Sequence, residues 1–199
     1  VYGYPIRGYW IDIGTPERLH QAAMDCLSGA VRHFDRKYHY RPNQWIHPST
    51  LAKIKPLLDS GEIKLIGNVS IGRNCLLEKG VSVENSHIGH TSLIERNAEI
   101  KDSMIMSFSH IEHMVSIRRS IVGRHSTIEE HSVLGSETND SLVAVIGENV
   151  NLPSDSVVST GVRVAPLKHS HSILATGRFV ELGTDERNIY FAEKVSVKR

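Results

Sequence analysis

The sequence predicts a mainly β protein in which most of the chain winds into a parallel β-helix. Three observations lead to this prediction: a repeat of 17 residues, aliphatic residues six, six and five positions apart within each copy, and a small residue four positions after most of them. This spacing matches neither the period of an α-helix nor the alternation of a long strand. It matches a chain that turns a corner after each short strand, so that stacked coils bury one continuous core.

The repeat is clearest in four consecutive copies between residues 71 and 138. The copies read IGRNCLLEKGVSVENSH, IGHTSLIERNAEIKDSM, IMSFSHIEHMVSIRRSI and VGRHSTIEEHSVLGSET. Each copy has three aliphatic positions, so each coil is expected to have three faces with one aliphatic side chain pointing inward from each. The small residues are expected near the corners in two columns: Cys75, Ser92, Ser109 and Ser126, and Val81, Ala98, Val115 and Ser132.

The β-helix is expected to span residues 46–165, with one interruption in its second half. After Leu134 the polar stretch GSETNDSLVA breaks the frame of the repeat. This stretch is predicted to be a loop that leaves the coils. The aliphatic spacing then resumes at Ile146 and continues to Val164.

A short helix is expected to interrupt the first coil. Ile46 and Ile66 fit positions in that coil, whereas the stretch STLAKIKPLL between them has helix-like spacing. Ser49 or Thr50 is expected to cap the start of this helix. The helix is therefore predicted to be an insertion in the first coil.

The repeat resembles that of the hexapeptide-repeat, left-handed parallel β-helix proteins, in which an aliphatic residue is often followed by Gly, with a small residue four positions on. The segments IGRNCL, IGHTSL and VGRHST match this pattern. The resemblance implies that the coils are left-handed. The general rule for parallel crossovers would favour the opposite hand.

Residues 8–29 do not follow the coil pattern. GYWIDIG is expected to form a short strand, and TPERLHQAAMDCLSG a helix that begins after Thr15 as N-cap, has Pro16 in its first position and ends at Gly29. This stretch resembles the end of the catalytic domain of sugar-phosphate nucleotidyltransferases, the NDP-sugar pyrophosphorylases. Many of them, including the mannose-1-phosphate guanylyltransferase and glucose-1-phosphate nucleotidyltransferase groups, carry a C-terminal left-handed β-helix.

The two resemblances occur in the expected order and imply a domain organisation. Residues 1–30 would be the end of the catalytic domain and residues 31–45 a linker. The β-helix follows, and residues 166–199 would cap it or form a contact between subunits. A homo-oligomer is therefore expected.

The family resemblance implies transfer of a nucleotidyl group from an NTP to a sugar 1-phosphate, with release of pyrophosphate. Asp12 in YWIDIGT would supply one carboxylate ligand to a catalytic Mg²⁺. The structural alternative is that Asp12 ends a strand and hydrogen-bonds the turn. Because the 199 residues contain neither the Gly-rich nucleotide-binding segment nor the second metal-binding Asp of these enzymes, the chain is expected to be a C-terminal portion that is inactive alone. The nucleotide and the sugar cannot be read from it.

Acyl transfer is an alternative function, because many hexapeptide-repeat proteins are acyltransferases that use a His as general base. The candidates on the coils are His110, His113, His125 and His131. A zinc site is disfavoured, since no pair of His has the five-residue spacing of the β-helix carbonic anhydrases. A non-catalytic β-helix scaffold is the third possibility.

Composition excludes several other classes of protein. The net charge is +1 with Lys and Arg spread along the chain, so no nucleic-acid footprint is present. No apolar run is long enough to span a membrane, and two Cys do not support a disulfide scaffold, so a cytoplasmic location is expected. The acidic column formed by Glu78, Glu95, Glu112 and Glu129 is expected to be a solvated face or the rim of a subunit contact.

Overall fold

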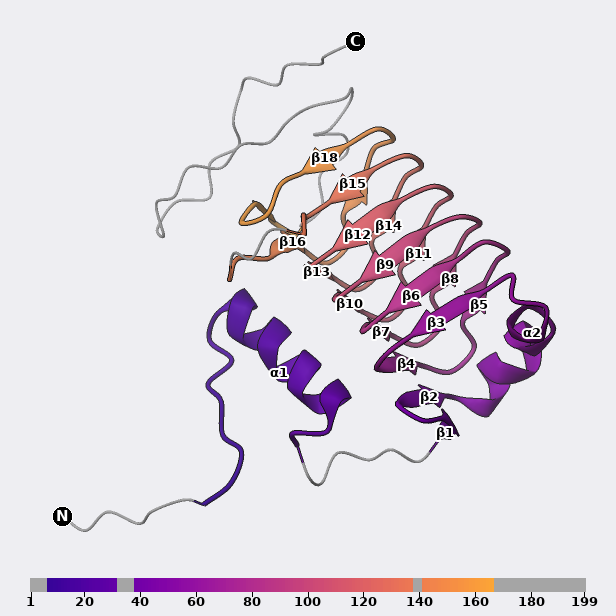
Figure 1. Ribbon diagram of the computed structural model, residues 1–199. Coiled ribbons are helices and arrows are strands. Elements are labelled where there is room, and N and C mark those ends of the chain that lie inside the picture. Colours follow the sequence, from indigo (N-terminus) through magenta and orange to yellow (C-terminus); the bar gives the residue numbers. More distant parts are fainter. Residues whose placement is uncertain (1–6, 32–37, 138–140, 167–199) are drawn as a thin grey trace.

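The computed structural model describes residues 7–31, 38–137 and 141–166. Most of these residues form short strands that stack into a parallel β-helix (Figure 1). The mainly β fold class is therefore confirmed. The left-handed sense of the coils stays a prediction from the family resemblance.

Three sheets form the three faces of the β-helix, and all strand pairs are parallel except β1 with β2. Sheet A contains β1 (His39–Arg41), β2 (Gln44–Ile46), β4 (Val69–Ile71), β7 (His87–Ile88), β10 (Met104–Ile105), β13 (Ser120–Val122), β16 (Ala144–Ile146) and β19 (Arg163–Val164). Sheet C contains β5 (Leu76–Leu77), β8 (Leu93–Ile94), β11 (His110–Ile111), β14 (Thr127–Ile128) and β17 (Asn151–Leu152). Sheet B contains β3 (Lys64–Ile66), β6 (Ser82–Glu84), β9 (Glu99–Lys101), β12 (Ser116–Arg118), β15 (Val133–Leu134) and β18 (Val157–Val158).

The strand register confirms the 17-residue repeat. Ile71 pairs with Ile88, Ile88 with Ile105, and Ile105 with Val122. These side chains are buried in one core cluster with the aliphatics of the other two faces. The next partner of Val122 is Ile146, 24 positions on, so the predicted loop adds seven residues between coils without changing the register.

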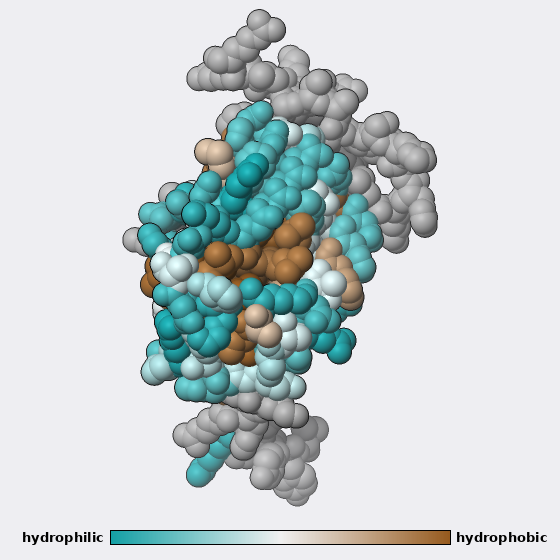
Figure 2. All heavy atoms as spheres, turned by 90° about the vertical axis from the view of Figure 1, so that its right-hand side faces the viewer, coloured by the Kyte–Doolittle hydropathy of each residue, from teal (hydrophilic) through white to brown (hydrophobic). Residues whose placement is uncertain are grey.

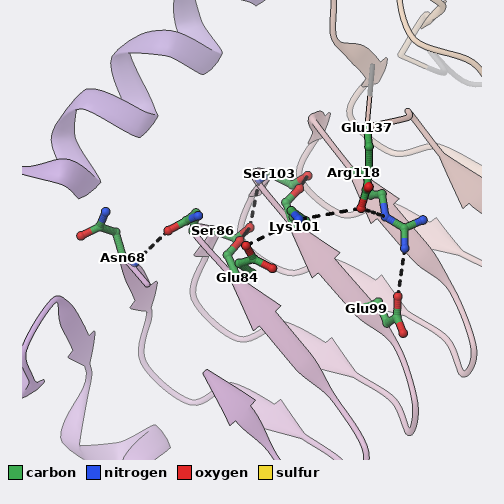
Figure 3. Close-up of polar contacts among 9 residues, drawn as sticks. Asn68, Glu84, Ser86, Glu99, Lys101, Ser103, Arg118 and Glu137 are labelled. Carbon is green, nitrogen blue, oxygen red and sulfur yellow. Dashed lines mark hydrogen bonds and ion pairs between the residues drawn. The ribbon is translucent and has the colours of Figure 1, made fainter. Parts of the chain in front are cut away.

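Both predicted columns of small residues are buried at corners of the coils. In the first column the side chain also links two coils, since Ser109 Oγ donates to Gly123 O at 3.0 Å and Ser126 Oγ to Gly147 O at 2.8 Å. A third buried column, Ser86, Ser103 and Ser120, was not predicted. There the hydroxyl accepts a backbone hydrogen bond from the next coil, as Ser86 does from Ser103 N–H at 2.9 Å (Figure 3).

The corners require left-handed backbone conformations. Asn74, Thr91, Phe108 and His125 occupy one such column, with φ between 55° and 63°. This conformation is strained for a β-branched or bulky residue such as Thr91 or Phe108. The hydrogen bonds and core packing of the stacked coils therefore hold residues in place against their own backbone preference.

Helix α2 (Pro48–Asp59) is the predicted insertion, but its N-cap is His47 rather than Ser49 or Thr50. Those two hydroxyls instead accept hydrogen bonds from the backbone of the coil. Ser49 Oγ accepts from Asn74 N–H and Thr50 Oγ1 from Cys75 N–H, both at 3.0 Å. The helix thereby covers backbone donors at the start of the stack.

Ile46 on β2 and Ile66 on β3 both lie in the first coil, as expected, but only Ile46 points inward. Ile46 is buried, whereas the side chain of Ile66 is about half-exposed. Leu65 takes the inward position on β3 because it pairs with Val83 of the next coil. A shift of one residue along a strand moves a side chain to the opposite face.

Helix α1 (Pro16–Ser28) confirms the predicted helix and its caps. Thr15 Oγ1 accepts from Arg18 N–H at 3.3 Å, and Gly29 ends the helix with φ of 94°. The predicted strand over residues 8–14 is wrong, because no strand forms there. A strand needs a neighbour to pair with, and Tyr9, Trp10 and Ile13 are exposed.

The expected linker and the expected C-terminal capping segment are only partly described by the structure. The range 31–45, expected to be a linker, contains β1 and the start of β2. Residues 167–199 of the expected capping segment lie outside the described part of the chain. Neither helix of the described residues is long and apolar enough to cross a membrane.

Apolar side chains also lie on the surface of the coils. Leu76 and Phe108 are each about half-exposed. Figure 2 shows one largely hydrophilic face on which hydrophobic side chains gather near the middle. The buried core therefore does not account for all apolar residues of the β-helix.

The inward and outward positions of one strand provide a test of the register. Ile94→Asp should prevent folding, because it places an unpaired carboxylate in the core, at a cost of several kcal/mol. Leu93→Asp should leave the fold intact, since Leu93 points outward from the same strand. Circular-dichroism melts of the two variants make this comparison. Equal loss of stability in both would contradict the register.

Candidate functional site

Asp12, the predicted metal ligand, lies on the exposed segment that leads into α1. Its Oδ1 accepts a hydrogen bond from Gly14 N–H at 3.1 Å, and its Oδ2 lies 3.4 Å from Arg18 Nη1. The carboxylate therefore bonds the turn, as the structural alternative predicted, and Arg18 balances its charge. The side chain remains exposed to solvent.

The residues around Asp12 fit Mg²⁺ only in part. A carboxylate oxygen is the kind of ligand that Mg²⁺ prefers. However, the described ranges contain no group of three or more His, Cys, Asp or Glu that could hold a metal ion. Asp12 can thus supply one ligand, and the remaining ligands would have to come from outside these residues.

The structure brings three of the four predicted His together, and two of them contact the carboxylate of Glu95. His110 Nε2 lies 2.7 Å from Glu95 Oε1, and His113 Nδ1 lies 3.7 Å from Glu95 Oε2. His113 also contacts Glu130, with 3.1 Å between Nε2 and Oε2, and its ring meets the edge of His131 at 5.4 Å between centroids. We call Glu95, His110, His113, Glu130 and His131 the Glu95 cluster.

His125 is not part of the Glu95 cluster. It lies at the corner between sheets A and C, where its ring stacks on Phe108 with 4.8 Å between centroids. The other three His lie on sheet C or at the corner between sheets C and B. Within the cluster, His110 is an imidazole held by a carboxylate, which is the arrangement of a general base.

Sequence reasoning missed Glu95 as the centre of this cluster. The signal was available in the spacing, because His110 and His113 follow Glu95 by 15 and 18 residues. Both offsets are close to the 17-residue coil and therefore place the side chains next to each other on neighbouring coils. The spacing of the His residues from one another does not reveal their proximity to Glu95.

The column of Glu78, Glu95, Glu112 and Glu129 was expected to be a solvated face or the rim of a subunit contact. Three of its carboxylates also accept hydrogen bonds from the coils. Glu78 accepts a hydrogen bond from Arg96 N–H, and Glu112 from Glu130 N–H, both at 3.1 Å. Glu129 accepts three, from Asn151 Nδ2, Ser154 N–H and Ser154 Oγ, at 2.8 to 3.1 Å. These carboxylates thus cap the corner of the following coil, which offsets the repulsion between like charges.

The hydrogen bonds to Glu129 change its acidity. Partial burial raises the pKa of this carboxyl, but the donors Asn151 and Ser154 outweigh it, and the pKa is lower than its ordinary value. A carboxyl with a lowered folded-state pKa stabilises the protein above its unfolded-state pKa. That contribution is lost as the pH falls through the folded-state pKa.

Among the described residues, the buried His20 and the half-buried His87 lie outside every predicted site. His20 of α1 is buried, and its Nε2 lies 2.6 Å from Asp102 O at a corner of the coils. Burial lowers the pKa of His20, and it lowers the pKa of His87 on sheet A to about 4. Both imidazoles are therefore neutral at pH 7. No motif marks either residue in the sequence.

The parallel coils, their common register and the small residues at their corners define a hexapeptide-repeat β-helix. Residues 84–179 match the family model described as the GMPPB C-terminal domain. A glucose-1-phosphate adenylyltransferase from Desulforamulus reducens is 29% identical over 113 residues. That alignment covers 41% of this chain but only 28% of the relative. The family match, this relative and the coils together fit the C-terminal β-helix of a sugar-phosphate nucleotidyltransferase.

Solved structures of similar shape are more distant. A mutant of perosamine N-acetyltransferase from Caulobacter crescentus, in complex with CoA and GDP-perosamine, is 19% identical over 62% of this chain and 50% of its own, with a TM-score of 0.35. The acetyltransferase domain of PglB from Neisseria gonorrhoeae is 17% identical over 61% of this chain and 54% of its own, with a TM-score of 0.29. Similarity at this level transfers no chemistry to the present chain.

The carboxylate caps can be tested within the acidic column. Glu129→Gln should lower the free energy of unfolding by about 1–2 kcal/mol at pH 7, because an amide cannot accept all three hydrogen bonds. Glu78→Gln is the matched control. It should change the free energy of unfolding by less than about 0.5 kcal/mol, since Glu78 is exposed and accepts one hydrogen bond. Urea titrations measure both values.

The same variants should differ in their pH dependence. As the pH falls through the acidic range, the difference in free energy of unfolding between wild type and Glu129→Gln should become smaller. Protonation of the Glu129 carboxylate removes the same hydrogen-bond acceptor as the substitution does. Equal effects of the two substitutions at pH 7 would contradict a capping role.

Proposed function

We propose that this chain is the C-terminal part of an enzyme that transfers a nucleotidyl group from an NTP to a sugar 1-phosphate. The observation that carries the proposal is the combination of the Asp12 turn and α1 with a β-helix that matches the GMPPB C-terminal domain. The chain covers about a quarter of the length of the curated relative. NTP and sugar 1-phosphate would therefore bind to parts of the enzyme outside this chain.

In the proposed reaction an oxygen of the sugar phosphate attacks the α-phosphorus of the NTP, and pyrophosphate leaves. Asp12 would hold Mg²⁺, which neutralises the charge that develops on the phosphates. The chain's own residues fix the carboxylate: Gly14 N–H orients one oxygen, and Arg18 lies beside the other. The β-helix would provide structure and a contact between identical subunits. The apolar patch in Figure 2 supports such a contact.

Asp12→Asn tests the proposed metal ligand. In the full-length enzyme this substitution should reduce nucleotidyl transfer by at least about a hundredfold, equivalent to roughly 2.7 kcal/mol, and high Mg²⁺ should restore part of the rate. The melting temperature should hardly change, because the Asn side chain can still accept from Gly14 N–H and the position is exposed. Steady-state kinetics and thermal melts measure the two effects.

Asp59→Asn is the matched control for this experiment. Asp59 is also an exposed carboxylate beside a basic side chain, Lys55, but it lies on α2. The control should leave the rate of transfer unchanged. A near-normal rate in Asp12→Asn would remove the metal role, and a large loss of stability would make Asp12 a structural residue.

Acyl transfer is a second candidate, and the observation that favours it is the contact of 2.7 Å between His110 and Glu95. If His110 is a general base, the chain should release CoA thiol from acetyl-CoA in the presence of a hexosamine 1-phosphate. His110→Asn should abolish the release, and His125→Asn, outside the Glu95 cluster, should not. Thiol release no faster than the uncatalysed background would exclude this activity.

A further inference from the structure

Helix α1 lies along the outside of sheet A (Figure 1). It contacts β13, where Ile121 points away from the core of the coils and yet is only 3% exposed. On the helix, His20 and Leu27 are seven residues apart, which places them on one face, and both are buried. The docking of α1 on this sheet therefore covers apolar surface of both elements.

Polar contacts fix the helix along the stack of coils. Glu17, in the first turn, accepts from Arg163 Nη2 with distances of 3.1 and 3.3 Å to its two oxygens. Arg163 belongs to β19, at the far end of the described coils. The contact of His20 Nε2 with Asp102 O lies on another coil. The helix is thus held at two levels of the stack.

The segment that carries Asp12 is tied to the same helix. Arg18 of α1 contacts Asp12, and Thr15 caps the first turn. Tyr9 reaches back to the third turn, where its hydroxyl donates to Asp25 Oδ2 at 2.7 Å. The position of the Asp12 carboxylate therefore depends on the position of α1.

We propose that the β-helix positions the Asp12 carboxylate through α1, and that Ile121 and Arg163 are positioning residues for nucleotidyl transfer. This inference rests on the proposed function. A helix of 13 residues is marginal in water on its own, so the order of α1 has to come largely from its docking. Residues of distant coils would then affect catalysis without touching any substrate.

The docking can be measured by hydrogen exchange of the α1 amides in this chain. Ile121→Asp places a carboxylate under the helix, and the amides of residues 19–28 should exchange at least about tenfold faster while the coils stay protected. Val133→Asp is the matched control, because Val133 points outward on sheet B of the same coil. It should leave exchange in α1 unchanged, and Ile121→Leu should behave as wild type.

A charge exchange provides a second variant that does not alter the apolar contact. Arg163→Glu places two carboxylates opposite each other and should accelerate exchange of the Arg18 and Leu19 amides, which hydrogen-bond Thr15 at the start of α1. Adding Glu17→Arg should reverse this acceleration. A structural role of either residue alone would not produce such a rescue.

The effect on catalysis is measured in the full-length enzyme. Ile121→Asp should lower kcat by about tenfold or more and raise the Mg²⁺ concentration that gives half-maximal rate, and Val133→Asp should change neither. Unchanged exchange in α1 would overturn the docking, and released α1 with normal kcat and normal Mg²⁺ dependence would overturn the positioning. Absence of transfer in the wild-type enzyme would instead reject the proposed function, while hydrogen exchange would still report on the docking.

Discussion

The parallel pairing between successive coils is the constraint on which the rest of this structure depends. Each strand finds its partners one coil earlier and one coil later, so the 17-residue period sets which side chains become neighbours. Every local feature is thereby converted into a column: inward aliphatics, buried hydroxyls, left-handed corners and carboxylate caps. Thr91 and Phe108 show the strength of this constraint, because they adopt a left-handed backbone that their side chains disfavour.

The sequence was sufficient to predict the features that depend on this period alone. The inward aliphatics of the four clear copies and two of the small-residue columns follow from counting positions and lie where they were predicted. The interruption after Leu134 is shorter than expected at its end, because β16 begins at Ala144. The caps of α1 were also predictable, since Thr15, Pro16 and Gly29 act locally. The left-handed sense of the coils follows only from the family resemblance.

Features that depend on contacts between distant residues could not be read in this way. The segment around Asp12, expected to be a strand, pairs with no strand of the described ranges. The hydroxyls of Ser49 and Thr50 accept hydrogen bonds from the first coil instead of capping their own helix. The Glu95 cluster joins side chains of neighbouring coils, and it becomes visible only when offsets are taken relative to the coil length. The docking of α1 is harder to predict, because Glu17 and Arg163 are 146 residues apart and α1 lies outside the repeat.

The loop between β15 and β16 shows which interactions maintain the register where the repeat is interrupted. Glu137, at the base of the loop, contacts Lys101 and Arg118 on sheet B at 3.8 and 3.2 Å (Figure 3). Glu137 is largely exposed, and exposed ion pairs contribute about 0–1 kcal/mol each. The return of the chain instead buries Ile146 beneath Val122, which is worth about 1.5–3 kcal/mol for the side chain alone, and restores the backbone pairing. Burial and backbone pairing therefore fix where the chain re-enters the stack, and the exposed ion pairs of Glu137 contribute less to it.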